Sequence, residues 1–147
     1  MKIIGKIDKA DFPGLFLSNI NIKIDTGAYT STIHCHHIKE IVINGEEQIE
    51  FQLMDPTHSK YCDETFKTKH YKRKWVKNSF GKSEHRFVVE TTMVIFEEEY
   101  PIELSLSERS DMKYPILIGR KLLNKRFIVD TSQQNLSFKL KKKKKKK

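Results

Sequence analysis

The residues with the clearest catalytic potential are Asp25, Thr26 and Gly27, which follow directly on an alternating apolar run. Ile22 and Ile24 occupy one face of a period-two pattern, and this predicts a β-strand that ends at Asp25. Gly27 has no side chain at the point where the backbone must turn. The motif therefore places one carboxylate on a rigid support, where it acts as a catalytic acid or base or simply caps a turn.

A second motif, near the end of the chain, favours the catalytic interpretation. Residues 116–118 are apolar throughout, which predicts a short buried strand ending at Ile118, and Gly119 and Arg120 follow directly. Leu122 and Leu123 then predict one or two helical turns. This second strand end is the partner that the Asp25 motif lacks on its own.

The remaining sequence consists mainly of short strand-like runs separated by turns. Strands are predicted over residues 2–8, 15–17, 30–36, 41–43, 49–53, 86–96, 102–106, 127–130 and 136–140, with an exposed extended segment over 61–76. Asn44-Gly45 suits a tight hairpin turn, although residues 46–48 suggest a longer loop. The turn cluster at 78–83 predicts a long hairpin with a mobile tip. Many short strands and one short helix indicate a mostly β, closed or partly closed barrel.

Taken together, these blocks resemble the retropepsin-like aspartic peptidases. The shared features are residues 25–28 at a strand end, a turn-tipped hairpin in mid-chain and the apolar-Gly-Arg block at 118–120. Over residues 1–132 the chain is similar to a small bacterial group labelled "ATP-dependent zinc protease". The sequence contains neither a His-Glu-x-x-His motif nor a phosphate-binding Gly-rich loop. The resemblance implies an acid-protease barrel lobe over residues 1–138, with one short helix near the C-terminus.

The resemblance also implies a chemistry. In retropepsin-like endopeptidases two carboxylates share a proton and activate one water for hydrolysis of a peptide or amide bond. This chain has a single Asp-Thr-Gly, so a homodimer is implied in which each copy supplies Asp25. Acidic peptide tails are an implied substrate. The other implied site residues are Thr26, Gly27, Ala28, Ile118, Gly119 and Arg120 as support, and Ser79, Phe80, Gly81 and Arg86 as a flap over the substrate.

Three alternatives stay open. Asp130 also ends a strand-like run, so it could pair with Asp25 within one chain. The run from His34 to His37 (His-Cys-His-His) contains good zinc ligands and would suit a zinc-dependent peptidase, although alternate residues of a strand face opposite sides. No cofactor is expected apart from this zinc. The third alternative is a non-catalytic binding module for acidic partners.

The net charge of +9 is concentrated at the C-terminus. Lys139 and residues 141–147 supply eight of the 28 basic residues, which leaves 20 basic against 19 acidic side chains elsewhere. A disordered poly-Lys tail that binds polyanions weakly is predicted over 139–147. With only Cys35 and Cys62, and no secretory segment recognised, reduced thiols and a cytoplasmic location are expected. No apolar run approaches the ~20 residues that cross a bilayer, so no membrane partner is expected.

Overall fold

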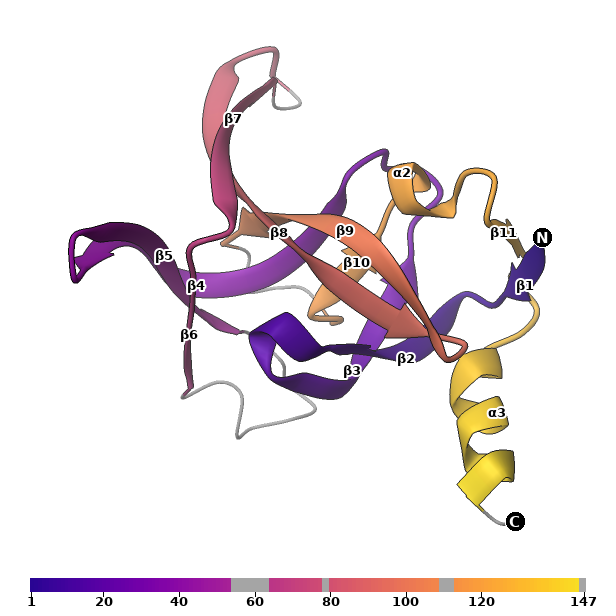
Figure 1. Ribbon diagram of the computed structural model, residues 1–147. Helices are drawn as coiled ribbons and strands as arrows, with labels where there is room; N and C mark the ends of the chain where they lie inside the picture. Colours follow the sequence, from indigo (N-terminus) through magenta and orange to yellow (C-terminus); the bar gives the residue numbers. More distant parts are fainter. Residues whose placement is uncertain (54–63, 78–79, 109–112, 146–147) are drawn as a thin grey trace.

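The computed structural model describes residues 1–53, 64–77, 80–108 and 113–145 (Figure 1). Strands dominate, as the sequence predicts. The strands are β1 (Lys2–Ile4), β2 (Ile7–Phe12), β3 (Leu17–Ile24), β4 (Ser31–Ile43), β5 (Glu46–Leu53), β6 (Thr65–Thr68), β7 (Tyr71–Lys77), β8 (Ser83–Ile95), β9 (Glu98–Ser107), β10 (Ile116–Ile118) and β11 (Phe127–Val129). The helical elements are η1 (Pro13–Leu15), α2 (Arg120–Leu123) and α3 (Leu136–Lys145).

Six of these strands close into a barrel. Hydrogen bonding runs from β10 through β3, β2, β8 and β9 to β4, and β4 pairs again with β10. Strand β10 closes the ring by lying parallel to β3 and antiparallel to β4. The predicted mostly β barrel with one short helix after Ile118 is confirmed.

Apolar residues of the barrel strands fill its interior in the expected period of two. Ile20, Ile22 and Ile24 of β3 are buried, while Lys23 between them is exposed. Only one face of β3 packs in the core, so apolar and polar residues alternate along the strand. This alternation is why the strand before Asp25 was predicted correctly. Within the described ranges, no helix has the length and apolar character to cross a membrane.

Two long hairpins extend beyond the barrel. Strands β4 and β5 meet at Asn44 and Gly45, both at positive φ (52° and 79°), and Ile43 pairs directly with Glu46. This is the tight two-residue turn that Asn-Gly favours, so the longer loop suggested by residues 46–48 is wrong. Strands β7 and β8 form the second hairpin, which rises away from the barrel in Figure 1. We call it the flap hairpin; Ser79, at its tip, lies outside the described residues.

The strand predicted over residues 136–140 is wrong, because these residues form the start of α3. The helix continues to Lys145, through the segment for which a disordered tail is predicted. The cause is a long-range cap. The backbone N–H groups of Ser137 and Phe138 donate to the Asp8 carboxylate at 2.9 and 3.1 Å, and Lys141 lies 3.3 Å from Asp11. These contacts cross about 130 residues of sequence and are invisible to local pattern reading. The domain boundary at residue 138 stays a prediction.

The capping of α3 by Asp8 can be tested by Asp8→Ala. Asp8 is buried and accepts three backbone N–H groups, from Lys9, Ser137 and Phe138. Losing these acceptors should lower the free energy of unfolding by about 2 kcal/mol and reduce the helical circular dichroism signal. Urea denaturation measures the first effect. Glu99→Ala, which removes an exposed carboxylate of β9, is the control and should cost under ~1 kcal/mol. Equal losses would contradict the capping role.

Candidate active site

Asp25 sits at the end of β3, at the mouth of the barrel. Its backbone N–H donates to the carbonyl of Ile118 at 2.8 Å, and its Oδ1 accepts the N–H of Gly27 at 3.1 Å. A Cβ at position 27 would lie 3.3 Å from that Oδ1, so glycine leaves the flank of the carboxylate open. The side chain of Asp25 is half-buried, and Thr26 and Gly27 beside it are exposed. The carboxylate is therefore fixed in position and accessible from outside.

The two sequence motifs lie side by side. Strands β3 and β10 are parallel, and Ile24 pairs with Ile118, so Asp25 and Gly119 leave the sheet together. The N–H of Gly119 donates to the buried Ser31 Oγ at 3.0 Å. We call residues 25–30, between β3 and β4, the active-site loop. A Cβ on Gly119 would lie 2.6 Å from the carbonyl oxygen of Tyr29, so only glycine lets β10 approach this loop so closely.

Arg120 braces the loop that carries Asp25. Its N–H donates to the carbonyl of Ala28 and its guanidinium to the carbonyl of Thr26, both at 2.9 Å. The N–H of Lys121 donates to the carbonyl of Tyr29, also at 2.9 Å. These donors come from the first turn of α2, where backbone N–H groups have no partner within the helix. Arg120 thus contacts this loop through both its backbone and its side chain.

A cavity of about 240 Å³ lies between the active-site loop and the flap hairpin. Ala28 and Thr30 line it from the loop, and Lys74 and Arg86 from the hairpin. Its remaining lining residues are Thr32, Val88 and Ser105. This places Ala28 and Arg86, both predicted site residues, at one cavity. Hydroxyl groups and two cations around a small space suit an anionic or strongly polar group.

The predicted tip residues of the flap are less closely engaged. Phe80 is 87% exposed, and Gly81 has a positive φ of 78°, which glycine adopts without strain. Neither of them lines the cavity beside the active-site loop.

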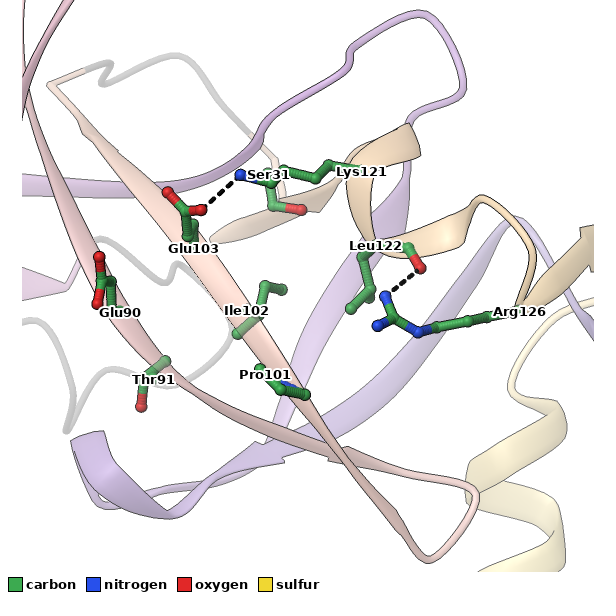
Figure 2. Close-up of a pocket in the computed structure, with 9 residues that line it drawn as sticks. All are labelled: Ser31, Glu90, Thr91, Pro101, Ile102, Glu103, Lys121, Leu122 and Arg126. Atoms are coloured by element: carbon green, nitrogen blue, oxygen red, sulfur yellow. Dashed lines mark hydrogen bonds and ion pairs between the residues drawn. The ribbon is translucent and has the colours of Figure 1, made fainter.

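A larger cavity, of about 390 Å³, lies behind the loop, between α2 and strands β8 and β9 (Figure 2). None of residues 25–28 lines it. Its most enclosed carboxylate, Glu103, contacts Lys121 at 2.5 Å and Lys72 at 2.8 Å. These two cations lower the pKa of Glu103 to about 2. A carboxylate held ionised in this way is a poor proton donor.

Asp130 is committed to its own turn. Its carboxylate accepts the N–H of Ser132 at 3.0 Å, the Ser132 hydroxyl at 2.6 Å and the Gln133 amide at 2.9 Å. The Ser132 and Gln133 side chains hold the pKa of Asp130 below its ordinary value. Such a carboxylate is a turn cap, which argues against a single-chain pair with Asp25.

The histidine run does not form a cluster. His34 and Cys35 are buried in β4, whereas His36 Nε2 lies 2.7 Å from the Gln52 Oε1 and His37 occupies a bulge with φ of 55°. Among the residues that the structure describes, no three His, Cys, Asp or Glu side chains gather closely enough to hold a metal ion. Cys62, the second cysteine of the chain, lies outside the described residues.

Two residues of this region are not singled out by the sequence. Ser31 follows the Asp-Thr-Gly block closely, but the sequence around it does not predict that its Oγ accepts the N–H of Gly119. Lys74 lies within a basic and aromatic run, and only the register of the flap hairpin places it directly opposite Arg86. A correct alignment of β7 with β8 would have been the one signal able to find it.

Comparison with known proteins is consistent with this geometry. The model of the RimB-like family, described as retropepsin-like aspartic endopeptidase RimB, matches residues 3–139. The chain belongs to this family. The crystal structure of a Legionella pneumophila protein of unknown function (DUF785), with 25% sequence identity to this chain, superposes with a TM-score of 0.69. The match covers 92% of this chain and 98% of that one.

Curated relatives of this RimB-like chain carry a different name. A protein of Desulfotalea psychrophila is 33% identical over 90% of this chain, and one of Shewanella pealeana is 32% identical over 89%. Both are named "Probable alpha-L-glutamate ligase". The chain spans only 29% of the length of each, so that name describes much larger proteins.

The close approach of β10 to the loop predicts the effect of Gly119→Ala. The new methyl group would overlap the backbone of Tyr29 and Thr30, which cannot move without shifting the Asp25 turn. Unfolding free energy should fall by about 2 kcal/mol, measured by chemical denaturation. Gly14→Ala, where the methyl group would meet only the Thr91 side chain, should cost less. A Gly119→Ala protein as stable as wild type would show that the loop is not tightly packed.

Proposed function

We propose that this chain is an aspartic-type peptidase that hydrolyses peptide or amide bonds with a water activated by Asp25. The observation that carries the proposal is the placement of Asp25, fixed at the end of a barrel strand, braced by β10 and α2 and accessible from outside. Membership of the RimB-like family supports the same chemistry. Our proposal gives Asp25 the catalytic role and gives Gly119 and Arg120 a supporting one.

The reaction needs a second carboxylate. One ionised carboxylate takes a proton from water while its protonated partner donates to the substrate carbonyl oxygen, and the water oxygen bonds to the carbonyl carbon. The resulting tetrahedral intermediate collapses when the amide nitrogen receives a proton and leaves. No covalent acyl-enzyme forms, so no nucleophilic Ser or Cys is required.

We place the second carboxylate on a second copy of the chain. Asp130 is occupied by its own turn, whereas the exposed Thr26 and Gly27 leave the Asp25 turn open to the same turn of another copy. A two-fold axis between the two turns would bring the two Asp25 side chains to one water. Thr26 would then join the turns through its hydroxyl group.

Acidic peptide tails are the proposed substrate class. Lys74 and Arg86 lie directly opposite each other in the flap hairpin and both line the cavity, and Glu84 contacts Arg86 at 3.2 Å. A bound anion would offset the remaining repulsion between the two cations. The ligase name of the relatives points to glutamate as a shared substrate unit. A glutamate-adding protein and a module that hydrolyses glutamyl bonds act on the same polymer in opposite directions. The ligase reaction itself is not assigned to this chain.

A second candidate function is non-catalytic binding of acidic partners by α3. Lys139, Lys142 and Lys143 are exposed on this helix, and no carboxylate within the described part of the chain lies within ion-pair distance of them. We propose a cytoplasmic location, because Cys35 is a free thiol and free thiols are usual in reducing compartments.

Asp25→Asn tests the central role of the carboxylate. The amide has the same shape and can still accept the Gly27 N–H, so folding should be unchanged while peptide hydrolysis falls about 10³-fold. Asp130→Asn is the matched control and should retain activity. Full activity in Asp25→Asn that disappears on addition of a metal chelator would replace the proposal with a zinc peptidase. Full activity in both variants, insensitive to chelator, would also reject it.

Lys74→Met tests the acidic substrate. Methionine keeps the length of the side chain but removes the charge, so kcat/KM for an oligoglutamate peptide should fall about tenfold while an uncharged peptide is unaffected. Lys67→Met, which removes an exposed lysine of β6 that does not line the cavity, is the control. Equal effects of both variants would reduce the result to a general loss of positive charge.

A further inference from the structure

One carboxylate ties the base of the flap hairpin to α2. Glu103, on β9, accepts Lys72 of β7 at its Oε2 and Lys121 of α2 at its Oε1, at 2.8 and 2.5 Å. Each carboxylate oxygen therefore has one cation, and the two cations come from different parts of the fold. Figure 2 shows the Lys121 side chain reaching from α2 to Glu103.

The two lysines belong to the two elements that flank the cavity beside Asp25, although neither of them lines that cavity. The backbone N–H of Lys121 donates to the carbonyl of Tyr29, so Lys121 moves with the active-site loop. Lys72 lies two residues before Lys74, hence on the same face of the flap hairpin, which is the face that lines the cavity. Glu103 thus links the hairpin to α2 and, through α2, to the loop, whereas Glu40 of β4 holds the hairpin separately through Arg73 and Tyr71.

The sheet itself does not need this arrangement. Glu103 lies directly opposite Glu90 in the β8–β9 pair, a placement that costs stability between like charges. Lys72 also contacts Glu90, at 3.4 Å, and so offsets the repulsion. The Glu103 side chain is only 23% exposed, against 45% for Lys121 and 46% for Lys72, which makes it the shielded centre of the group. An apolar pair would have served the barrel equally well.

We propose that Glu103 is a positioning residue that fixes the flap hairpin over the Asp25 turn by holding Lys72 and Lys121 at once. This role rests on the proposed peptidase function, in which the hairpin covers the bound peptide. Without the charge of Glu103 the hairpin moves more freely at its base. Peptides are then held less well between the hairpin and the loop, and catalysis slows.

Trp75 provides a direct probe of this motion. It is the only tryptophan of the chain, lies on β7 and is 70% exposed. Time-resolved fluorescence anisotropy of Trp75 reports nanosecond motion of the hairpin without any need for activity. In Glu103→Gln the fast component of the decay should grow, and kcat/KM for a peptide substrate should fall about fivefold, as expected for losing two partly exposed ion pairs.

Glu98→Gln is the matched control. Glu98 also lies on β9 and forms an ion pair, but with Lys2, away from the flap hairpin and α2. Both the anisotropy decay and kcat/KM of this variant should equal those of wild type. If Glu103→Gln behaves like Glu98→Gln in both measurements, Glu103 has no positioning role.

A double-mutant cycle tests the link itself. Lys72→Met and Lys121→Met each break one arm, so their combined effect on Trp75 anisotropy should be no larger than that of either alone. Additive effects would overturn the proposal. These variants also decide the question if Glu103→Gln does not fold. A wild-type chain without peptidase activity would refute the proposed function, while the anisotropy would still decide the role of Glu103.

Discussion

The parallel pairing of β10 with β3 is the interaction on which the rest of the structure depends. It closes the barrel, because β10 is the strand that joins β3 to β4. It also sets Gly119 beside Asp25, so that α2 begins where its free N–H groups reach the carbonyls of Ala28 and Tyr29. A single three-residue strand thus serves both the core and the site. Changes that weaken this pairing should therefore affect folding and catalysis together.

The same pairing leaves the site incomplete in one chain. Within the described residues, the printed hydrogen bonds of the Asp25 turn involve its backbone groups and the Asp25 Oδ1. None of these bonds comes from a second carboxylate. Asp130 is the alternative considered within the chain, and its carboxylate oxygens accept hydrogen bonds from Ser132 and Gln133. The proposed peptidase chemistry needs a second carboxylate, and a second copy of the chain is our proposed source of it.

Local patterns predicted the parts of the fold that rest on local physics. The alternating run before Asp25, the Asn44-Gly45 turn and the apolar run at 116–118 each carry their own signal, and the structure has a strand or turn at each. The helix α3 carried no such signal, because it depends on a buried carboxylate from β2. The alternation of Leu136, Phe138 and Leu140 was therefore mistaken for a strand.

The site was predictable to a similar extent. Asp25, Gly119 and Arg120 could be selected from two short motifs, but the contacts among them depend on strand register, which a one-residue shift would destroy. Lys74 and Glu103 could not be found from the sequence, since their importance comes from side chains brought together across strands β7, β8 and β9. Charge runs in a sequence do not reveal which lysine meets which carboxylate.

The most direct test of the central claim is to measure specific peptidase activity and sedimentation of the wild-type chain over the same range of protein concentrations. If catalysis needs Asp25 from two copies, specific activity will rise in step with the fraction of dimer and vanish in dilute monomer. A chain that sediments as a monomer throughout, with constant specific activity, would contradict the shared active site.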